Sequence, residues 1–178
     1  MGTRHLICVV KDNEYKLAQY GQWDGYPKGQ GVNILTFLRD FDRDVFEKNV
    51  AGLSWAIVSD LEKIVEKHPD DWAKVFPQFS RDCGSDVLYI IQNNATLLVR
   101  NDIEFAADSL LCEYAYVIDL DKSTFEVYEG FNHTPLTEDD RFFSLQEHGT
   151  EYKPVMLNIV YNLNALPTED EFLDYFKP

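Results

Sequence analysis

Residues 4–10, RHLICVV, and residues 14–23, EYKLAQYGQW, decide how this chain begins to fold. The first stretch is apolar and rich in β-branched residues, which favours a strand. Between the two stretches, Asp12-Asn13 tolerates the positive φ angles of a two-residue turn. The pattern therefore predicts an N-terminal β-hairpin with a polar open end. With the turn at that point, the strands pair in the register Val10–Tyr15, Cys8–Leu17, His5–Tyr20 and Thr3–Gln22.

The C-terminal half contains the other expected strands. Residues 110–118, LLCEYAYVI, and residues 124–129, TFEVYE, flank a turn at Asp119–Ser123. They are expected to form a second hairpin. Residues 155–163, VMLNIVYNL, read as a last long strand. Strands that pair with their neighbours in sequence produce an antiparallel sheet.

Helices are expected between these two sets of strands and at the end of the chain. Apolar residues recur at helical spacing over residues 34–41 and again over residues 55–65. A capping box at Thr168–Glu171 opens a terminal helix. Residues 85–100 fit a helix or a strand equally well. The order of elements predicts an α+β fold, in which a mainly antiparallel sheet from the N-terminal hairpin and the C-terminal strands has helices packed on it.

Size and charge restrict the classes of function. The chain has 178 residues, which suits a single globular domain over residues 1–178, and 45% of them are hydrophobic, enough for a core. The 31 acidic and 16 basic residues give a net charge of −15. Nucleic acid and anionic membranes are not expected partners, because both are bound through lysine and arginine. A small polar molecule is the expected partner, a protein partner stays open, and so does the oligomeric state.

Cysteine and histidine usage restricts location and chemistry. Three widely spaced cysteines without a CxxC motif are expected to be free thiols in a reducing compartment. With no signal peptide and no apolar run long enough for a membrane span, a cytoplasmic location is expected. The four histidines fall in four different expected elements, and no GxSxG motif is present. A metal site, an α/β-hydrolase site and a cofactor are therefore not expected.

Polar side chains gather at the open end of the first hairpin, and they form the candidate ligand-binding site: Thr3, Arg4, Gln22, Asp24 and Tyr26. Arg4 can hold a carboxylate or pair with Asp24. Gln22 can bind an amide or a base edge through two hydrogen bonds. A structural role explains the residues equally well, with an Arg4–Asp24 pair that fixes the loop and Tyr26 packed beneath it. The pattern identifies no catalytic residue.

The loop that contains two of these residues, DGYPKGQG at residues 24–31, has the composition of a tight strand-to-helix turn. It lacks the Gly-Lys-Ser/Thr ending of a P-loop, and it is not a GxGxxG motif. It can still present backbone N–H groups to an anion at a helix N-terminus. Lys28 would favour a phosphate there, and Asp24 would oppose it.

The N-terminal motifs resemble those of an uncharacterised protein family. Met1-Gly2-Thr3-Arg4 is followed, after a hairpin, by Gln22-x-Asp24-Gly25-Tyr26-Pro27-x-Gly29-x-Gly31. This pattern is similar to that of small proteins of filamentous fungi, which have shorter relatives in bacteriophages and bacteria. The stretch from Phe105 through Glu113-Tyr114 to Tyr128 also resembles the fungal members, so the resemblance covers most of the chain. It implies a fungal origin and a site at the N-terminal motif, and it implies no reaction.

A looser resemblance is to the N-terminal nucleophile hydrolases. These enzymes also begin with a strand that runs into a hairpin, and the first residue of the mature chain is their nucleophile. Removal of Met1 would leave Gly2 first, which carries no nucleophile, and exposure of Thr3 would require a second cleavage. The expected function is therefore a small-molecule-binding protein or an enzyme acting at the hairpin mouth. The alternatives are a non-catalytic protein-interaction module and an inactive relative of these hydrolases.

Overall fold

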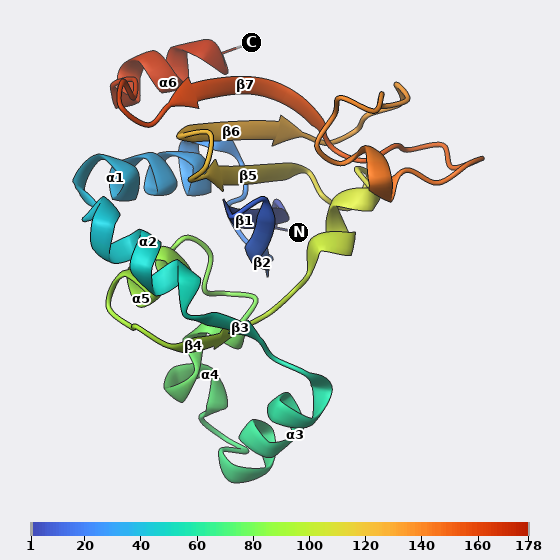
Figure 1. The fold of residues 1–178 in the computed structure, drawn as a ribbon. Coiled ribbons are helices and arrows are strands. Elements are labelled where there is room, and N and C mark those ends of the chain that lie inside the picture. The colour runs from blue at the N-terminus through green and yellow to red at the C-terminus, as the bar shows by residue number, and fades with distance from the viewer. Residues whose placement is uncertain (1, 178) are drawn as a thin grey trace.

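The computed structural model describes residues 2–177 (Figure 1). Its centre is a five-stranded sheet in the order β2-β1-β5-β6-β7. Neighbouring strands are antiparallel except β1 and β5, which are parallel. The predicted α+β fold with a mainly antiparallel sheet is confirmed. The strands are β1 (His5–Lys11), β2 (Glu14–Gly21), β5 (Tyr114–Asp119), β6 (Thr124–Glu129) and β7 (Met156–Asn162).

The first hairpin has the expected turn, but its predicted register is wrong beyond the first pairs. Asp12-Asn13 adopts positive φ angles of 56° and 57°. A register shift next to Val9 adds one residue to β2, so Val9 faces Leu17 and His5 faces Gly21. The bulge keeps Leu17 on the same face as Val9, and both are fully buried there. A regular register would have turned Leu17 to the opposite face.

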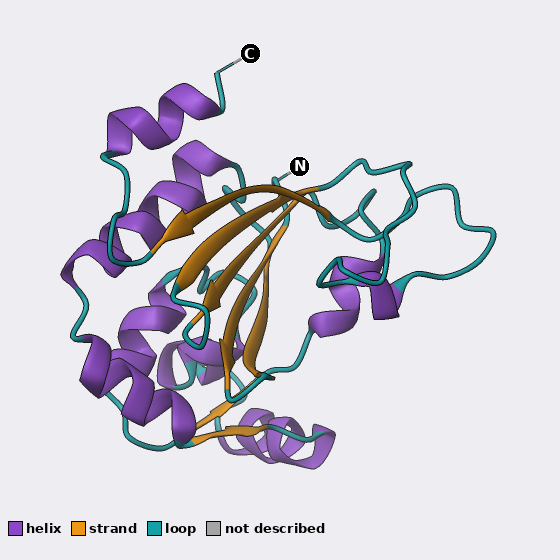
Figure 2. Cartoon of the chain, turned by 45° about the horizontal axis from the view of Figure 1, so that its top comes forward, coloured by secondary structure: helices purple, strands orange, loops and turns teal. Residues whose placement is uncertain are grey.

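Helices cover one face of the sheet, which we call the helix face (Figure 2). A π-helical turn, η1 (Pro27–Gly31), leads directly into the first of them. Apolar side chains of these helices pack on the inward side chains of β1, β5 and β6. The predicted capping box at Thr168 is confirmed, because its hydroxyl accepts the Glu171 N–H. The helices are α1 (Val32–Asp40), α2 (Arg43–Ala51), α5 (Asp86–Gln92) and α6 (Glu169–Tyr175).

The opposite face, which we call the loop face, is covered by irregular structure (Figure 2). Two short 3-10 helices lie there, η3 (Ile103–Ala107) and η4 (Phe143–Leu145). The long segment 130–155 carries η4 and packs Phe142 against Tyr128 of β6, with ring centroids 4.9 Å apart. The amino-acid sequence of segment 130–155 did not predict that it covers a face of the sheet.

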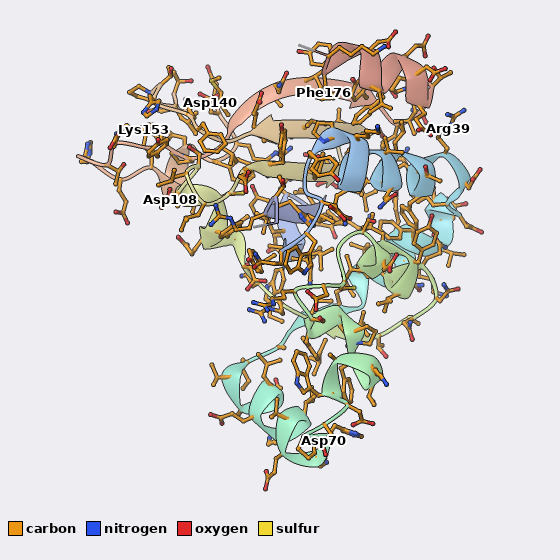
Figure 3. All side chains as sticks on the ribbon, turned by 180° about the vertical axis from the view of Figure 1, so that it is seen from behind. Arg39, Asp70, Asp108, Asp140, Lys153 and Phe176 are labelled. Atoms are coloured by element: carbon orange, nitrogen blue, oxygen red, sulfur yellow. The ribbon has the colours of Figure 1, made fainter. Side chains whose placement is uncertain are left out.

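A small extension projects away from the five-stranded sheet (Figure 1). It contains a two-stranded parallel sheet and two helices, and Figure 3 shows Asp70 at its tip. The ambiguous residues 85–100 form both a helix, α5, and a strand. The amphipathic helix expected over residues 55–65 begins later, and none of its side chains is buried. The elements are β3 (Leu53–Trp55), α3 (Val58–Lys67), α4 (Trp72–Val75), the 3-10 turn η2 (Pro77–Phe79) and β4 (Leu97–Val99).

Candidate functional site

One end of the sheet, where β5 begins and β6 ends, forms the floor of the candidate site. Tyr114 and Glu129 pair directly across these two strands, so their side chains project to the same face. On β7, a register shift opposite Val127 and Tyr128 leaves Asn158 as the additional residue. A bulge of this kind redirects a side chain. Asn158 Nδ2 donates a hydrogen bond of 2.8 Å to Glu129 Oε2.

The loop that follows β2 forms the second side of the site. Asp24 has a positive φ of 54°, a conformation that aspartate tolerates. Gly25 is held from two directions: its N–H donates to the Thr3 carbonyl at 2.9 Å, and its carbonyl accepts the buried Tyr116 hydroxyl at 2.7 Å. These bonds fix the backbone that carries residues 26–28 over the end of the sheet.

Helix α6 closes the third side. Its Phe172 is fully buried and anchors the helix in the core, with its ring centroid 6.2 Å from that of Phe125. The Tyr175 hydroxyl lies 2.9 Å from Asn158 Oδ1 and 3.2 Å from the Asn158 carbonyl oxygen. Phe176 follows the helix and lies at the same edge of the sheet (Figure 3). A hydrogen-bonded chain therefore runs from Tyr175 through Asn158 to Glu129.

These three elements surround a cavity of about 650 Å³. That volume is within the range of small-molecule sites, which are commonly ~300–1,000 Å³. Four of the ten lining residues are aromatic, and four carry polar or charged side chains. The lining residues are Tyr26, Pro27, Lys28, Tyr114, Glu129, Asn158, Leu173, Tyr175, Phe176 and Lys177.

Three ionisable groups that line the cavity have raised pKa values. Partial burial raises the pKa of the Tyr114 hydroxyl, and the negative charges of Glu129 and Glu113 raise it further. The hydrogen bond to Asp24 raises the pKa of Tyr26, and the bond to Asp174 raises that of Lys177. These shifts move each group further from neutral pH. The walls thus offer rings, neutral hydroxyls, one carboxylate and two ammonium groups.

The structure places the five predicted site residues at two different places. Tyr26 lines the cavity, and Asp24 reaches it by accepting the Tyr26 hydroxyl at 3.1 Å. Arg4 instead lines a second hollow of about 570 Å³, together with Tyr20. Gln22 accepts a hydrogen bond from the Tyr20 hydroxyl. Thr3 contributes its backbone carbonyl to the loop.

Arg4 pairs with Glu113 and not with Asp24. Its backbone N–H donates to Glu113 Oε1 at 3.1 Å, and its Nε lies 3.5 Å from the same oxygen. The parallel pairing of β1 with β5 places Glu113 beside Arg4. Because that pairing joins distant parts of the chain, the pattern of the first hairpin did not reveal it.

His5, which was expected near the polar mouth, is buried on the helix face at 1% exposure. A Cβ on Gly21 would lie 2.2 Å from its ring, so only glycine permits this packing. Within residues 2–177, neither ring nitrogen has a hydrogen-bond partner. Burial lowers the pKa of His5 to about 4, against smaller opposing effects of the Thr3 backbone and Asp24. The ring is therefore neutral at physiological pH.

A buried ion cluster on the loop face was not predicted either. Arg141, from segment 130–155, donates to Asp119 at 2.6 Å and to the two Glu126 oxygens at 2.7 and 2.8 Å. Both carboxylates are nearly fully buried. Burial lowers the pKa of Arg141, but its bonds to Glu126 and Asp119 hold it above the usual value. Asp119 had been assigned to a turn alone. The cluster fastens the long segment to the sheet.

The sequence analysis did not predict the other cavity residues. The expected pairing of the second hairpin nevertheless brings two of them together. Counting outward from the turn at Asp119–Ser123 pairs Tyr114 with Glu129, as observed. The spacing of the last aromatic residues predicted a helix but gave no position for it. Asn158 depends on the bulge in β7, for which the sequence offers no signal.

No protein-family model, curated protein or solved structure matches this chain significantly. Across residues 2–177, no group of three or more histidine, cysteine, aspartate or glutamate side chains is arranged to hold a metal ion. Nor does this part of the chain contain a helix of the length and apolarity needed to cross a membrane. The geometry of the cavity is therefore the basis for a functional proposal.

Proposed function

We propose that this protein binds a small organic molecule in the cavity between the loop after β2, the end of the sheet and α6. The observation that carries the proposal is the hydrogen-bonded chain from Tyr175 through Asn158 to Glu129 beneath aromatic walls. Such a chain holds the polar groups in position before a ligand arrives. Aromatic and apolar walls with a few placed polar groups are characteristic of small-molecule sites.

Exposure of the rings supports binding over a purely structural role. Tyr26 is 40% exposed and Tyr175 is 49% exposed, although both line the same hollow. A structural aromatic cluster would bury these rings against each other. Within residues 2–177, Asn158 is the hydrogen-bond partner of the Glu129 side chain, and it occupies only Oε2. The other carboxylate oxygen remains available to a ligand.

The test is a thermal-shift screen of the full chain against amino acids, nucleotides and sugars, followed by calorimetric titration of any compound that stabilises it. A ligand raises the melting temperature by mass action. The Tyr26→Ala variant should bind such a compound more weakly, because it loses one wall of the cavity. Phe131→Ala is the matched control, since Phe131 is 54% exposed and does not line the cavity. Equal affinity in both variants would contradict the proposed site.

A protein-interaction module is the second candidate, and the extension favours it. Ile57, Val58 and Val65 of this region are 63%, 73% and 46% exposed. Apolar side chains gathered in this way commonly mark protein-binding surfaces. Under this alternative, Val58→Glu would abolish self-association of the protein, which sedimentation at increasing protein concentration measures. The same variant would leave ligand affinity at the cavity unchanged.

We also infer that the protein is cytoplasmic, that it belongs to the fungal family its N-terminal motifs resemble, and that it does not bind nucleic acid. The net charge of −15 supports the last point, because phosphate neutralisation needs clustered basic residues. Fluorescence anisotropy with duplex DNA and RNA at physiological salt should show no binding. A sub-micromolar, salt-sensitive affinity would contradict this.

A further inference from the structure

The cavity has an acidic corner between aromatic rings. Glu129 stands directly opposite Tyr114 on the same face of the sheet, and the Asn158 side chain links it to Tyr175. A carboxylate and the faces of aromatic rings both attract an ammonium group. This corner is therefore complementary to a cation.

The loop side of the cavity carries an ammonium group, that of Lys28, while the Asp24 carboxylate of the same loop is engaged with the Tyr26 hydroxyl. Lys28 lies in η1 and forms no ion pair within residues 2–177, although the chain carries 31 acidic residues. That turn contains no acidic residue, so the Lys28 ammonium group has no carboxylate partner within it. Lys177 also lines the rim, where its ammonium group is already paired with Asp174. This side is complementary to an anion.

We propose that the ligand is a small zwitterion, with its ammonium group at Glu129 and its anionic group at Lys28. The inference rests on the proposed function and narrows it to one class of ligand. A neutral sugar would leave both charged positions unpaired. A nucleotide would bring several negative charges towards Glu129. An aromatic amino acid carries both charged groups and a ring, and it is small enough for the volume of about 650 Å³.

The experiment compares three probes that share one ring: phenylalanine, phenethylamine and 3-phenylpropionate. The second probe lacks the carboxylate, and the third lacks the ammonium group. Titration of the full chain, followed by NMR or calorimetry, should give phenylalanine an affinity about tenfold higher than either of the others, or about 1.4 kcal/mol. Similar affinities for phenylalanine and 3-phenylpropionate would overturn the ammonium site.

Two variants test whether Glu129 binds the ammonium group of the ligand and Lys28 its anionic group. Glu129→Gln keeps an acceptor for Asn158 and should weaken phenylalanine and phenethylamine about fivefold or more, while 3-phenylpropionate is unchanged. Lys28→Gln should weaken phenylalanine and 3-phenylpropionate and leave phenethylamine unchanged. Both side chains are exposed, and near-UV circular dichroism checks that each variant is folded.

The outcomes separate this inference from the proposed function. If another compound of the wider screen binds and Tyr26→Ala weakens it, but phenylalanine shows no advantage, the zwitterion inference is overturned and the cavity remains a binding site. If no compound binds, or Tyr26→Ala changes no affinity, both are overturned. A tenfold preference for phenylalanine that Glu129→Gln and Lys28→Gln each remove supports both.

Discussion

The helix face and the loop face of the sheet bury titratable groups in opposite ways. On the helix face, His5 is buried without a hydrogen-bond partner within residues 2–177, and it is neutral. On the loop face, Arg141, Asp119 and Glu126 are buried as ions, and each is bonded to another. Regular helices cover their face with apolar side chains, which exclude charge. The irregular segment 130–155 has fewer such side chains, and a bonded ion cluster fastens it instead.

The largest effect is expected on the loop face, from Arg141→Met. The variant leaves Asp119 and Glu126 buried without their partner, which should lower the free energy of unfolding by ~3–5 kcal/mol. Urea denaturation of both proteins at neutral pH measures this. The matched control is Arg100→Met, because Arg100 forms a more exposed pair with Asp102. That change should cost at most ~1 kcal/mol, and equal losses in the two variants would show that the cluster is not what fastens the segment.

The free energy of unfolding should depend on pH because the helix face buries a neutral histidine. The pKa of His5 is about 4 in the folded protein and about 6.5 when unfolded. Between these values the unfolded state binds the additional proton, so the stabilising contribution is fully present above pH 6.5 and is lost as pH falls towards 4. The loss should reach about 3 kcal/mol, seen in urea midpoints measured across this range.

His5→Phe isolates this effect, since the variant keeps a ring against Gly21 and has nothing to titrate. Protonation of carboxylates at low pH lowers the free energy of unfolding of both proteins equally. The difference between the two pH curves therefore comes from His5. A difference curve that is flat from pH 7 to pH 4 would mean that the ring is protonated, or reaches water, in the folded protein.

A smaller loss of stability is expected from variants of two groups that contact the loop after β2. Tyr116→Phe removes the buried hydroxyl that donates to the Gly25 carbonyl, which should cost ~1–3 kcal/mol. Asp24→Asn changes an exposed side chain whose side-chain bond is to Tyr26, and asparagine tolerates the same positive φ. Its effect on stability should stay within ~0.5 kcal/mol. A larger loss in Asp24→Asn than in Tyr116→Phe would show that the carboxylate holds the loop.

The smallest expected effect is the coupling between Arg4 and Glu113. A double-mutant cycle with Arg4→Ala and Glu113→Ala should give a coupling energy of at most ~1 kcal/mol, because the pair is partly solvated. The corresponding cycle with Arg4→Ala and Asp24→Asn should be additive. Coupling in the second cycle and none in the first would restore the pairing first expected from the sequence.

Elements with local signals could be predicted from the sequence. Turn chemistry at Asp12-Asn13 and the capping box at Thr168 identified a hairpin and a helix, and residues 124–129 form β6 with the expected bounds. The register of the first hairpin was wrong because a bulge leaves no trace in a pattern of apolar residues. The covering role of segment 130–155 was not predicted, because Arg141 contacts partners that are distant in sequence.

The candidate site was predicted less well than the fold. The loop after β2 was identified, and Tyr26 from it lines the cavity. Arg4 was grouped with that loop, but it faces Glu113 because β1 pairs with β5. Tyr175 reaches Asn158 only through the folding of α6 across the end of the sheet. Each of these placements depends on contacts between segments far apart in the chain.

The parallel pairing of β1 with β5 also governs how the protein reaches its native state. His5 pairs with Tyr114, so the central contact of the sheet closes a loop of roughly 110 residues, and such non-local pairings slow folding. During synthesis, the N-terminal hairpin leaves the ribosome long before its partner strand. Until then, the apolar edge of β1 is unpaired, and unpaired edges of this kind attract other chains. The edge of β1 is therefore covered only after residues 114–119 have been made and have paired with it.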